Sequence, residues 1–591
     1  MKIGLCQFNA VVGNPRYNVK RMVERMRQAS ERGWAVILFG ELALSGYYSQ
    51  DLFFNEEYID EVNRAWLSLK EESDRLGIAV GTGMPRRNAS EKGGCKHLYN
   101  SFCFYWPGKT EFTQDKVCLP TYAEFDEARW FQAGSLQNVQ ARVFGSYRVG
   151  FLICEDGWNN KEGVLDSPYR LYSEDPVESL VQQGVNVIVN ISASPDYLGK
   201  QIRRMEMNQR IAKSYKMPIV FLNVVGAQDE LVFGGQSFAI NALGEPILRM
   251  KRCEEDLQLI DLEKMGQRRK RAVFPEPVMP MAELDDFLGL YLKDYLRKSG
   301  CELSKVILGL SGGKDSTAVA AILARHLGAD RVIGVMMPYK RGLYTQEISR
   351  HLAKELAESL CITLREVSID DEVASLMEKL GVKKDTIAHQ NLQARVRAII
   401  LWGIANNENA LVINTTNFSE AAMGYGTIGG DLLGLPLIAS LPATIIIDYL
   451  KWLQREGVPA ITDEMINREP SAELIPGQLD ANELGEYAYI DPLIESLRMN
   501  FGDIRKVASQ ILDPSKKEYG CYHESEAARL HFFERLSFLA KKLLVNTEFK
   551  RWYYHKTPQL MPYSWLRWKW PVANAYMKIE ELVAQVKKEM T

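Results

Sequence analysis

One short segment restricts the fold of this chain more than any other: an apolar run, a glycine-rich turn and an amphipathic helix follow one another directly. Residues Val306–Leu310 read VILGL, which is typical of a strand buried on both faces. The turn that follows begins Ser-Gly-Gly, and residues Ser316–Leu327 place apolar side chains at helical spacing. This order predicts a strand–turn–helix unit of a parallel sheet, in which backbone N–H groups at the helix N-terminus bind an anion.

The turn itself, GLSGGKDST, does not match the ordinary Walker A phosphate loop. The position five residues before Gly313 is Leu308 instead of glycine, and Lys314 is followed by Asp315 instead of serine or threonine. An aspartate repels phosphate unless it holds a cation, so Mg²⁺ that bridges Asp315 to pyrophosphate is the simplest interpretation. The hydroxyl of Ser316 is a further donor to such an anion.

Length, charge and cysteine use limit the class of protein. The 591 residues predict two large domains, or three. The 72 basic and 75 acidic side chains give a net charge of −3, which favours small substrates over nucleic acid or a membrane surface. An apolar stretch at Leu432–Ile447 is too short to span a membrane, and polar residues interrupt the N-terminus where a secretory signal would continue. Nine scattered cysteines without a CxxC pair fit a cytoplasmic protein.

Composition divides the chain into two α/β domains. Residues 1–264 alternate short β-rich runs with helical patterns, and residues 265–282 contain a basic cluster and the proline-rich FPEPVMP, which mark a linker. In residues 283–591 a new alternation of strands and helices begins, and it predicts a doubly wound parallel sheet. The predicted strands of the first domain are Ile3–Phe8, Val36–Phe39, Ile78–Gly81, Phe102–Trp106, Val149–Ile153, Val185–Ile191, Ile219–Val225 and Phe238–Ile240.

Three segments of the first domain contain residues suited to catalysis. Cys154 ends an apolar strand in RVGFLICEDGW, Glu41 ends another in LFGELALSGY, and Lys116 precedes a tyrosine and several acids in DKVCLPTYAEFDEARWFQAG. Each residue alone also fits a structural role. Together the segments resemble the nitrilase-like amidohydrolases, whose Glu-Lys-Cys triad matches Glu41, Lys116 and Cys154. The resemblance covers about residues 1–260 and implies a four-layer αββα sandwich. A thiolate attacks an amide carbon, a carboxylate transfers the proton, and an ammonium stabilises the oxyanion.

Two further patterns resemble the glutamine-hydrolysing branch of that family. One is the KxxLPxYxxFDExRxF pattern, which contains Tyr122, and the other is SASPxxxGK, which contains Ser194 and Lys200. The resemblance implies that these three residues hold glutamine. Each is also compatible with an ordinary loop serine, tyrosine or solvated lysine.

The second domain resembles the N-type ATP pyrophosphatases through its SGGxDS pattern. These enzymes transfer AMP from ATP to an acid and then use an amine to displace the AMP, so an ammonia-producing domain suits them. The segments NLQARVRAIILWGIAN, VINTTNFSEAAMGYGTIGGD, PSAELIPGQLD and TEFKRWYYHKTP resemble, in order, the glutamine-dependent NAD⁺ synthetase family. The resemblance implies an adenine nucleotide α-hydrolase-like fold, with ATP-binding residues Gly309, Ser311, Gly312, Gly313, Asp315, Ser316 and Thr415. It also implies dinucleotide-binding residues Asn391, Arg395, Glu420 and Lys550, and Mg²⁺ at Asp315 and Glu420.

Several positions depart from that family close to the chemistry. Phe418 and Ala443 stand where the family commonly has lysines, and Ala481 stands where it has an acid. The segment 339–351 is also unusual, and Lys340 or Arg341 are candidates for a compensating cation. The acceptor is therefore either nicotinic acid adenine dinucleotide or another carboxylate in a sister amidotransferase; a third alternative is a regulatory protein that has lost ATP use. The family resemblance also implies homo-oligomers formed through the synthetase domains.

Overall fold

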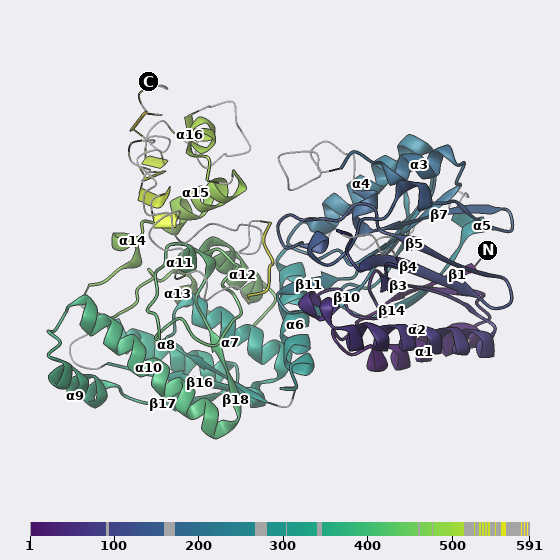
Figure 1. Cartoon of the computed structure of the whole chain (residues 1–591). Helices are drawn as coiled ribbons and strands as arrows, with labels where there is room; N and C mark the ends of the chain where they lie inside the picture. The colour runs from purple at the N-terminus through teal and green to yellow at the C-terminus, as the bar shows by residue number, and fades with distance from the viewer. Residues whose placement is uncertain are drawn as a thin grey trace. The chain divides into compact units, whose positions relative to one another are not determined.

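The computed structural model divides into two compact units, Met1–Lys298 and Ser299–Thr591, which are shown in Figure 1. This division falls after the linker predicted at 265–282, because helix α6 (Pro280–Lys298) packs against the hairpin β10–β11 (Val225–Gln228 and Leu231–Gly234) of the first unit. The structure describes residues 2–89, 94–158, 172–265, 280–339 and 345–512, except 303, 459, 460, 476 and 501, and scattered residues beyond 512 that include 550 and 557–562.

The first unit contains two six-stranded sheets. In the first sheet the strand order is β14-β1-β2-β3-β4-β5, and in the second it is β13-β12-β9-β8-β7-β6. The strands of the first sheet are β1 (Lys2–Gln7), β2 (Val36–Phe39), β3 (Ala79–Arg87), β4 (Leu98–Trp106), β5 (Thr110–Asp115) and β14 (Asp256–Asp261). Those of the second are β6 (Arg142–Phe144), β7 (Tyr147–Ile153), β8 (Val187–Ser192), β9 (Ile219–Asn223), β12 (Phe238–Ile240) and β13 (Pro246–Arg249).

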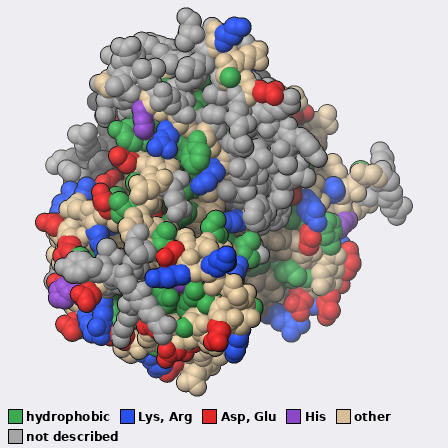
Figure 2. Space-filling view, turned by 90° about the vertical axis from the view of Figure 1, so that its left-hand side faces the viewer, with side chains coloured by type: hydrophobic (Ala, Val, Ile, Leu, Met, Phe, Trp, Pro, Cys, Tyr) green, Lys and Arg blue, Asp and Glu red, His purple; other side chains and the backbone are tan. Residues whose placement is uncertain are grey.

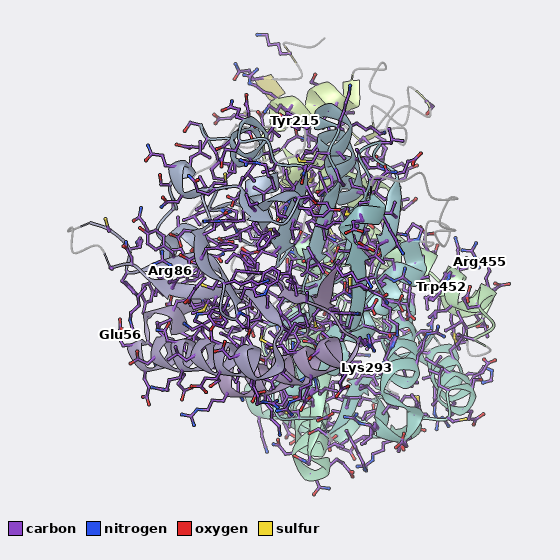
Figure 3. All side chains as sticks on the ribbon, turned by 90° about the vertical axis from the view of Figure 1, so that its right-hand side faces the viewer. Glu56, Arg86, Tyr215, Lys293, Trp452 and Arg455 are labelled. Carbon is purple, nitrogen blue, oxygen red and sulfur yellow. The ribbon has the colours of Figure 1, made fainter. Side chains whose placement is uncertain are left out.

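The two sheets pack face to face, with helices on their outer faces. One hydrophobic cluster joins Leu5 and Phe102 of the first sheet to Phe151 of the second, and the rings of Phe102 and Phe151 stack 4.7 Å apart. The helices are α1 (Pro15–Glu31), α2 (Glu56–Leu76), α3 (Pro176–Gln182), α4 (Lys200–Tyr215) and α5 (Leu262–Met265). In Figure 3, Glu56 of α2 and Tyr215 of α4 lie on opposite sides of this unit. The predicted αββα sandwich is confirmed.

The second unit contains a five-stranded parallel sheet in the order β17-β16-β15-β18-β19. Its strands are β15 (Lys305–Gly309), β16 (Val332–Met336), β17 (Thr363–Glu366), β18 (Ala410–Asn414) and β19 (Leu435–Pro436). Its helices are α7 (Lys314–Leu327), α8 (Thr345–Ser359), α9 (Asp370–Leu380), α10 (Ile387–Glu408), α11 (Phe418–Ala422), α12 (Ala443–Arg455), α13 (Asp463–Asn467), α14 (Asp480–Glu483), α15 (Tyr487–Met499) and α16 (Ile504–Leu512).

Both faces of this sheet are covered. Ile307 and Ile333 share a cluster with α9 and α10, while Val306 and Leu308, which point the opposite way along β15, are buried as well. The predicted doubly wound parallel sheet is therefore confirmed. The strand order reverses direction between β15 and β18, and ligands of such sheets bind at the carboxyl ends of the strands at this switch point.

The described residues on the face seen in Figure 2 carry charges of both signs, intermixed. Figure 2 shows Lys and Arg next to Asp and Glu over the visible face, with no large area of one sign, in agreement with the net charge of −3. Within the described helices, none combines the length and the apolar character needed to cross a bilayer.

Candidate active sites

In the first unit, the three residues of the predicted triad follow the ends of three strands. Glu41 comes two residues after β2, Lys116 comes directly after β5, and Cys154 comes directly after β7. Glu41 and Lys116 are completely buried, and Cys154 is 5% exposed. Gly83 of β3 permits this arrangement, because a Cβ there would lie 2.2 Å from the backbone nitrogen of Leu42, next to Glu41.

The Lys116 ammonium lies between two carboxylates. Its Nζ is 2.7 Å from Glu41 Oε1 and 2.6 Å from Glu127 Oε1. The sequence analysis did not identify Glu127, although it belongs to the FDE segment that supported the family resemblance. Tyr47 donates its hydroxyl to Glu127 at 2.8 Å, so the second carboxylate has a fixed position as well.

Glu41 is oriented by two further donors. Asn100 Nδ2 donates to Oε1 at 2.8 Å, and the backbone N–H of Ala193 donates to Oε2 at 2.7 Å. Asn100 Nδ2 also lies 3.4 Å from Glu127 Oε2. Donors therefore engage both oxygens of Glu41 and hold the carboxylate in one orientation next to the lysine.

Burial and charge determine the resting protonation of these groups. Burial alone lowers the pKa of Lys116, but Glu127 and Glu41 raise it well above its usual value, so the lysine is an ammonium. Burial, and next the charge of Glu41, raise the pKa of Cys154 well above that of a free thiol. Burial raises the pKa of Glu127 to about 7. Cys154 is therefore a thiol at rest and needs a neighbouring base before it attacks.

A strained turn presents the thiol. Cys154 has φ of +46° and begins a short 3₁₀ segment, Cys154–Gly157. Asp156 Oδ1 accepts the backbone N–H groups of Val117 and Cys118 at 3.0 and 2.8 Å. The turn that contains Cys154 is thereby tied to the segment that follows Lys116.

Two of the three predicted glutamine-binding residues, Tyr122 and Lys200, lie close to the same turn. The Tyr122 hydroxyl donates to Glu155 at 3.1 Å, and Lys200 Nζ lies 4.5 Å from the centroid of the Trp158 ring. Burial raises the pKa of Glu155 to about 7, and the charge of Lys200 partly opposes this shift. Tyr122 and Lys200 are thus both near Glu155, a residue that the sequence analysis did not identify.

Ser194, the third predicted glutamine-binding residue, is buried in a different network. Its hydroxyl accepts from Arg204 at 3.0 Å, and its backbone N–H donates to Asn223 at 2.9 Å. Arg204 is completely buried and also pairs with Asp196 at 3.0 Å. The described contacts of Ser194 hold the Ser-Ala-Ser-Pro segment in place.

In the second unit, the glycine turn forms one wall of a cavity of about 350 Å³ at the carboxyl ends of β15, β16 and β18. Gly312 has φ of +76°, and a Cβ there would lie 2.7 Å from the carbonyl oxygen of Ser349, so the turn requires glycine. Of the predicted ATP-binding residues, all except Gly312 line the cavity: Gly309, Ser311, Gly313, Asp315, Ser316 and Thr415.

The predicted metal ligands lie close together in this cavity. Asn417 bridges them, since its Nδ2 donates to Asp315 Oδ1 at 3.1 Å and its backbone N–H donates to Glu420 Oε2 at 3.2 Å. Burial, and next the charge of Asp315, raise the pKa of Glu420 well above its usual value. The described residues contain no cluster of three or more acidic, histidine or cysteine ligands. The carboxyl oxygens of Asp315 and Glu420 suit Mg²⁺, which binds few protein ligands and completes its shell with substrate phosphates.

The predicted dinucleotide-binding residues other than Glu420 meet one loop instead of the cavity wall. Lys550 Nζ donates to the carbonyl oxygens of Gly424 and Gly426, each at 2.9 Å. Asn391 accepts from the Thr427 hydroxyl at 2.7 Å, and Arg395 donates to Ile428 O at 3.2 Å. The structure therefore brings Asn391, Arg395 and Lys550 together around residues 424–428.

Two of the positions that were predicted to depart from the family, Phe418 and Ala443, are buried outside the cavity wall. Phe418 and Ala443 are at most 1% exposed and are not among the described residues that line it. The guanidinium of Arg498 lies 5.4 Å from the Phe418 ring centroid. Lys340 and Arg341 lie outside the described residues, whereas Arg350 of the same unusual segment lines the cavity, as do Arg397 and Arg468.

Comparisons with known proteins match both units. Residues 2–270 match a family of carbon-nitrogen hydrolases, and residues 285–517 match the NAD synthase family. A glutamine-dependent NAD(+) synthetase of Synechocystis is 36% identical over 84% of this chain and 88% of that protein, and one of Acinetobacter baylyi is 34% identical over 83% and 87%. The solved structure of an Acinetobacter baumannii glutamine-dependent NAD⁺ synthetase with ADP is 28% identical, with a TM-score of 0.71 over 92% of this chain and 94% of that one.

Proposed function

This chain belongs to the glutamine-dependent NAD⁺ synthetases, and we propose that it amidates nicotinic acid adenine dinucleotide with ammonia from glutamine, using ATP. Such an enzyme is a ligase that forms a C–N bond. Family membership favours this substrate over another carboxylate and over a regulatory protein without ATP use. The proposal rests mainly on one observation: a buried cysteine, glutamate and lysine and an SGGKDS cavity occur in the same chain.

In the first unit, we assign the hydrolysis of glutamine to Glu41, Lys116 and Cys154. Glu41 takes the thiol proton, and the Cys154 sulfur forms a bond to the carboxamide carbon. Lys116 stabilises the resulting oxyanion, and Glu41 returns the proton to the departing ammonia. Water then attacks the thioester with Glu41 as the base and releases glutamate. Tyr122, Ser194 and Lys200 are the proposed glutamine-binding residues.

In the second unit, we assign the binding of ATP to Gly309, Ser311, Gly312, Gly313, Asp315, Ser316 and Thr415. The acid's carboxylate oxygen forms a bond to the α-phosphorus, and the bond between that phosphorus and the oxygen bridging to the β-phosphorus breaks with its electron pair on pyrophosphate. Ammonia then attacks the acyl carbon, AMP leaves with the C–O electron pair, and one proton is released. Asn391, Arg395, Glu420 and Lys550 are the proposed residues for the dinucleotide acid.

Magnesium is part of this proposal. Asp315 and Glu420 would hold the ion, which would supply positive charge to the phosphates. Support comes from the position of the two side chains: both line the cavity, and Asn417 donates to each of them.

Two broader assignments complete the proposal. We propose a cytoplasmic enzyme, since reducing conditions would preserve the Cys154 thiol. We also propose a homo-oligomer formed through the second unit, because α9 and α10 expose apolar side chains: Leu380 is 65% exposed, Ile387 76% and Ile399 67%.

One assay tests the function. Purified protein receives MgATP, glutamine and nicotinic acid adenine dinucleotide, and NAD⁺, AMP, pyrophosphate and glutamate are measured. Equal amounts of NAD⁺, AMP and pyrophosphate are expected. AMP release with a different acid but without NAD⁺ formation would favour the sister amidotransferase, and no ATP use with any acid would contradict both.

A further inference from the structure

The glycine turn contains a buried lysine that the assignments above leave without a role. Lys314 is the first residue of α7, its side chain is 4% exposed, and it lines the cavity. Its Nζ lies 2.7 Å from Asp315 Oδ2 and 4.9 Å from the centroid of the Tyr487 ring. A buried ammonium requires such partners, and here the main partner is a proposed metal ligand.

The acids near Lys314 outnumber it. Asp315, Glu420 and Asp480 all line the cavity, and all three interact electrostatically with the ammonium. One ammonium cannot balance the charge of three ionised carboxyl groups, so a further cation would be stabilised among them. Asp315 therefore has two cationic partners available to it: the lysine beside it in the chain and a divalent cation brought by the nucleotide.

Lys314 is also placed to reach phosphate. It is the only lysine among the described residues that line the cavity, and its neighbours on that wall are Ser311, Gly313 and Ser316. The three arginines there have other contacts: Arg350 pairs with Glu366, Arg468 pairs with Glu473, and Arg397 donates to Met337 O. A flexible four-carbon stem lets the lysine ammonium change partner.

The substituted positions explain why this lysine matters. The family's lysines are replaced by Phe418 and Ala443, and both side chains are buried away from the cavity wall. Neither Phe418 nor Ala443 supplies positive charge to the cavity, whereas Lys314 lies on its wall.

We propose that Lys314 binds the phosphates of ATP. Before the nucleotide binds, the Lys314 ammonium pairs with Asp315. Asp315 exchanges the ammonium for the divalent cation, and Lys314 turns to the β- and γ-phosphate oxygens. When the bond to the α-phosphorus breaks, the electron pair leaves on pyrophosphate beside this ammonium, and Lys314 keeps its proton. This inference rests on the proposed function of the second unit.

The test compares Lys314→Met with Lys314→Arg and with a control, Lys305→Met, whose lysine is 46% exposed on the preceding strand. Electron paramagnetic resonance measures Mn²⁺ binding to the nucleotide-free protein, and calorimetry measures the Kd of an ATP analogue with a methylene group between its α- and β-phosphorus atoms. Ammonia-driven NAD⁺ synthesis and glutaminase activity are measured in parallel.

The expected effects on Lys314→Met have opposite directions. Mn²⁺ should bind about 10-fold tighter, because Asp315 has lost its competing partner, and the nucleotide should bind about 10- to 100-fold more weakly. Lys314→Arg should keep most of the nucleotide affinity. Lys305→Met should match the wild type, and glutaminase activity should be unchanged in all variants.

Several results would overturn the inference. An unchanged affinity of Lys314→Met for either ligand contradicts it, and weaker binding of both ligands indicates that the lysine only maintains the fold. The wild-type reaction separates this inference from the proposed function. If the wild type makes NAD⁺ while the variant binds both ligands normally, only the inference fails. If the opposite binding changes occur in a protein that makes no NAD⁺, only the proposed function fails.

Discussion

Replacing Glu127 by glutamine tests how the first site enables Glu41 to act as the base. Glu127 Oε1 lies 2.6 Å from Lys116 Nζ, and Glu41 Oε1 lies 2.7 Å from the same atom, with all three side chains buried. While Glu127 is ionised, the ammonium is shared between two carboxylates, and Glu41 is available to accept the Cys154 proton. In Glu127→Gln the ammonium pairs with Glu41 alone, which makes Glu41 a weaker base for the Cys154 proton.

The expected loss follows from this geometry. One buried charge-assisted hydrogen bond is worth about 1.5–3 kcal/mol, and about 1.4 kcal/mol corresponds to a tenfold change in rate. Glutaminase kcat should therefore fall about 10- to 100-fold, while ammonia-driven NAD⁺ synthesis stays unchanged. Glutamate release at saturating glutamine measures the first rate, and Glu111→Gln, which changes a 46%-exposed carboxylate on β5, is the control.

The pH dependence gives a second readout. Burial raises the pKa of Glu127 to about 7, so the carboxylate is protonated at lower pH and the wild type should lose glutaminase activity as the pH falls through about 7. The amide variant should lack this transition. Folding depends on the same group with the opposite sign: the raised pKa favours the folded state at low pH, and this contribution is lost as the pH rises from about 4.5 through about 7. A variant with wild-type kcat and an unchanged pH profile would refute this role of Glu127.

The remaining predictions concern the separation of glutamine hydrolysis and NAD⁺ synthesis into two sites, and the packing around Glu41. Cys154→Ala should abolish glutamine-driven NAD⁺ synthesis and leave ammonia-driven synthesis intact; equal loss of both rates would contradict separate sites. Asp315→Ala should have the reverse effect, stopping synthesis while glutamine hydrolysis continues, and unchanged synthesis would argue against its role at the metal. Gly83→Ala places a Cβ 2.2 Å from Leu42 N and should lower the free energy of unfolding by about 1–3 kcal/mol in chemical denaturation, with a loss of glutaminase activity. Gly403→Ala, where a Cβ meets no atom within 4 Å, is its control and should leave stability equal or higher.

The sequence predicted the parts of the sites that lie on regular strands. Glu41 and Cys154 each follow an apolar run, so both the strand and the polar residue at its end are visible in the pattern. Lys116 follows the largely polar segment TEFTQD, and the family resemblance identified it instead. Glu127 was not predicted, because it lies in an irregular segment, where no periodicity shows which acid points inward. Its proximity to Lys116 depends on the path of the chain after β5.

Contacts between distant segments were harder to predict. Asn391 and Lys550 meet the loop 424–428 through carbonyl and hydroxyl partners that no local pattern specifies. Arg350 lines the cavity, although the sequence favoured Lys340 or Arg341 in the same segment. The family resemblance supplied Asn391 and Lys550 as candidates, but their geometry depends on tertiary packing.

The two sites use a buried lysine in different ways. Lys116 lies between Glu41 and Glu127, and hydrogen bonds from Asn100 and Ala193 orient Glu41, so the ammonium has a fixed position at the proposed site of the glutamine oxyanion. Among the described contacts Lys314 has one close carboxylate partner, Asp315, which lies in the first turn of α7, where we propose that phosphate binds. Hydrolysis of an amide develops charge at one oxygen, which suits a fixed cation, whereas adenylation moves charge from the α-phosphate to the departing pyrophosphate. A cation that changes partner suits that second reaction.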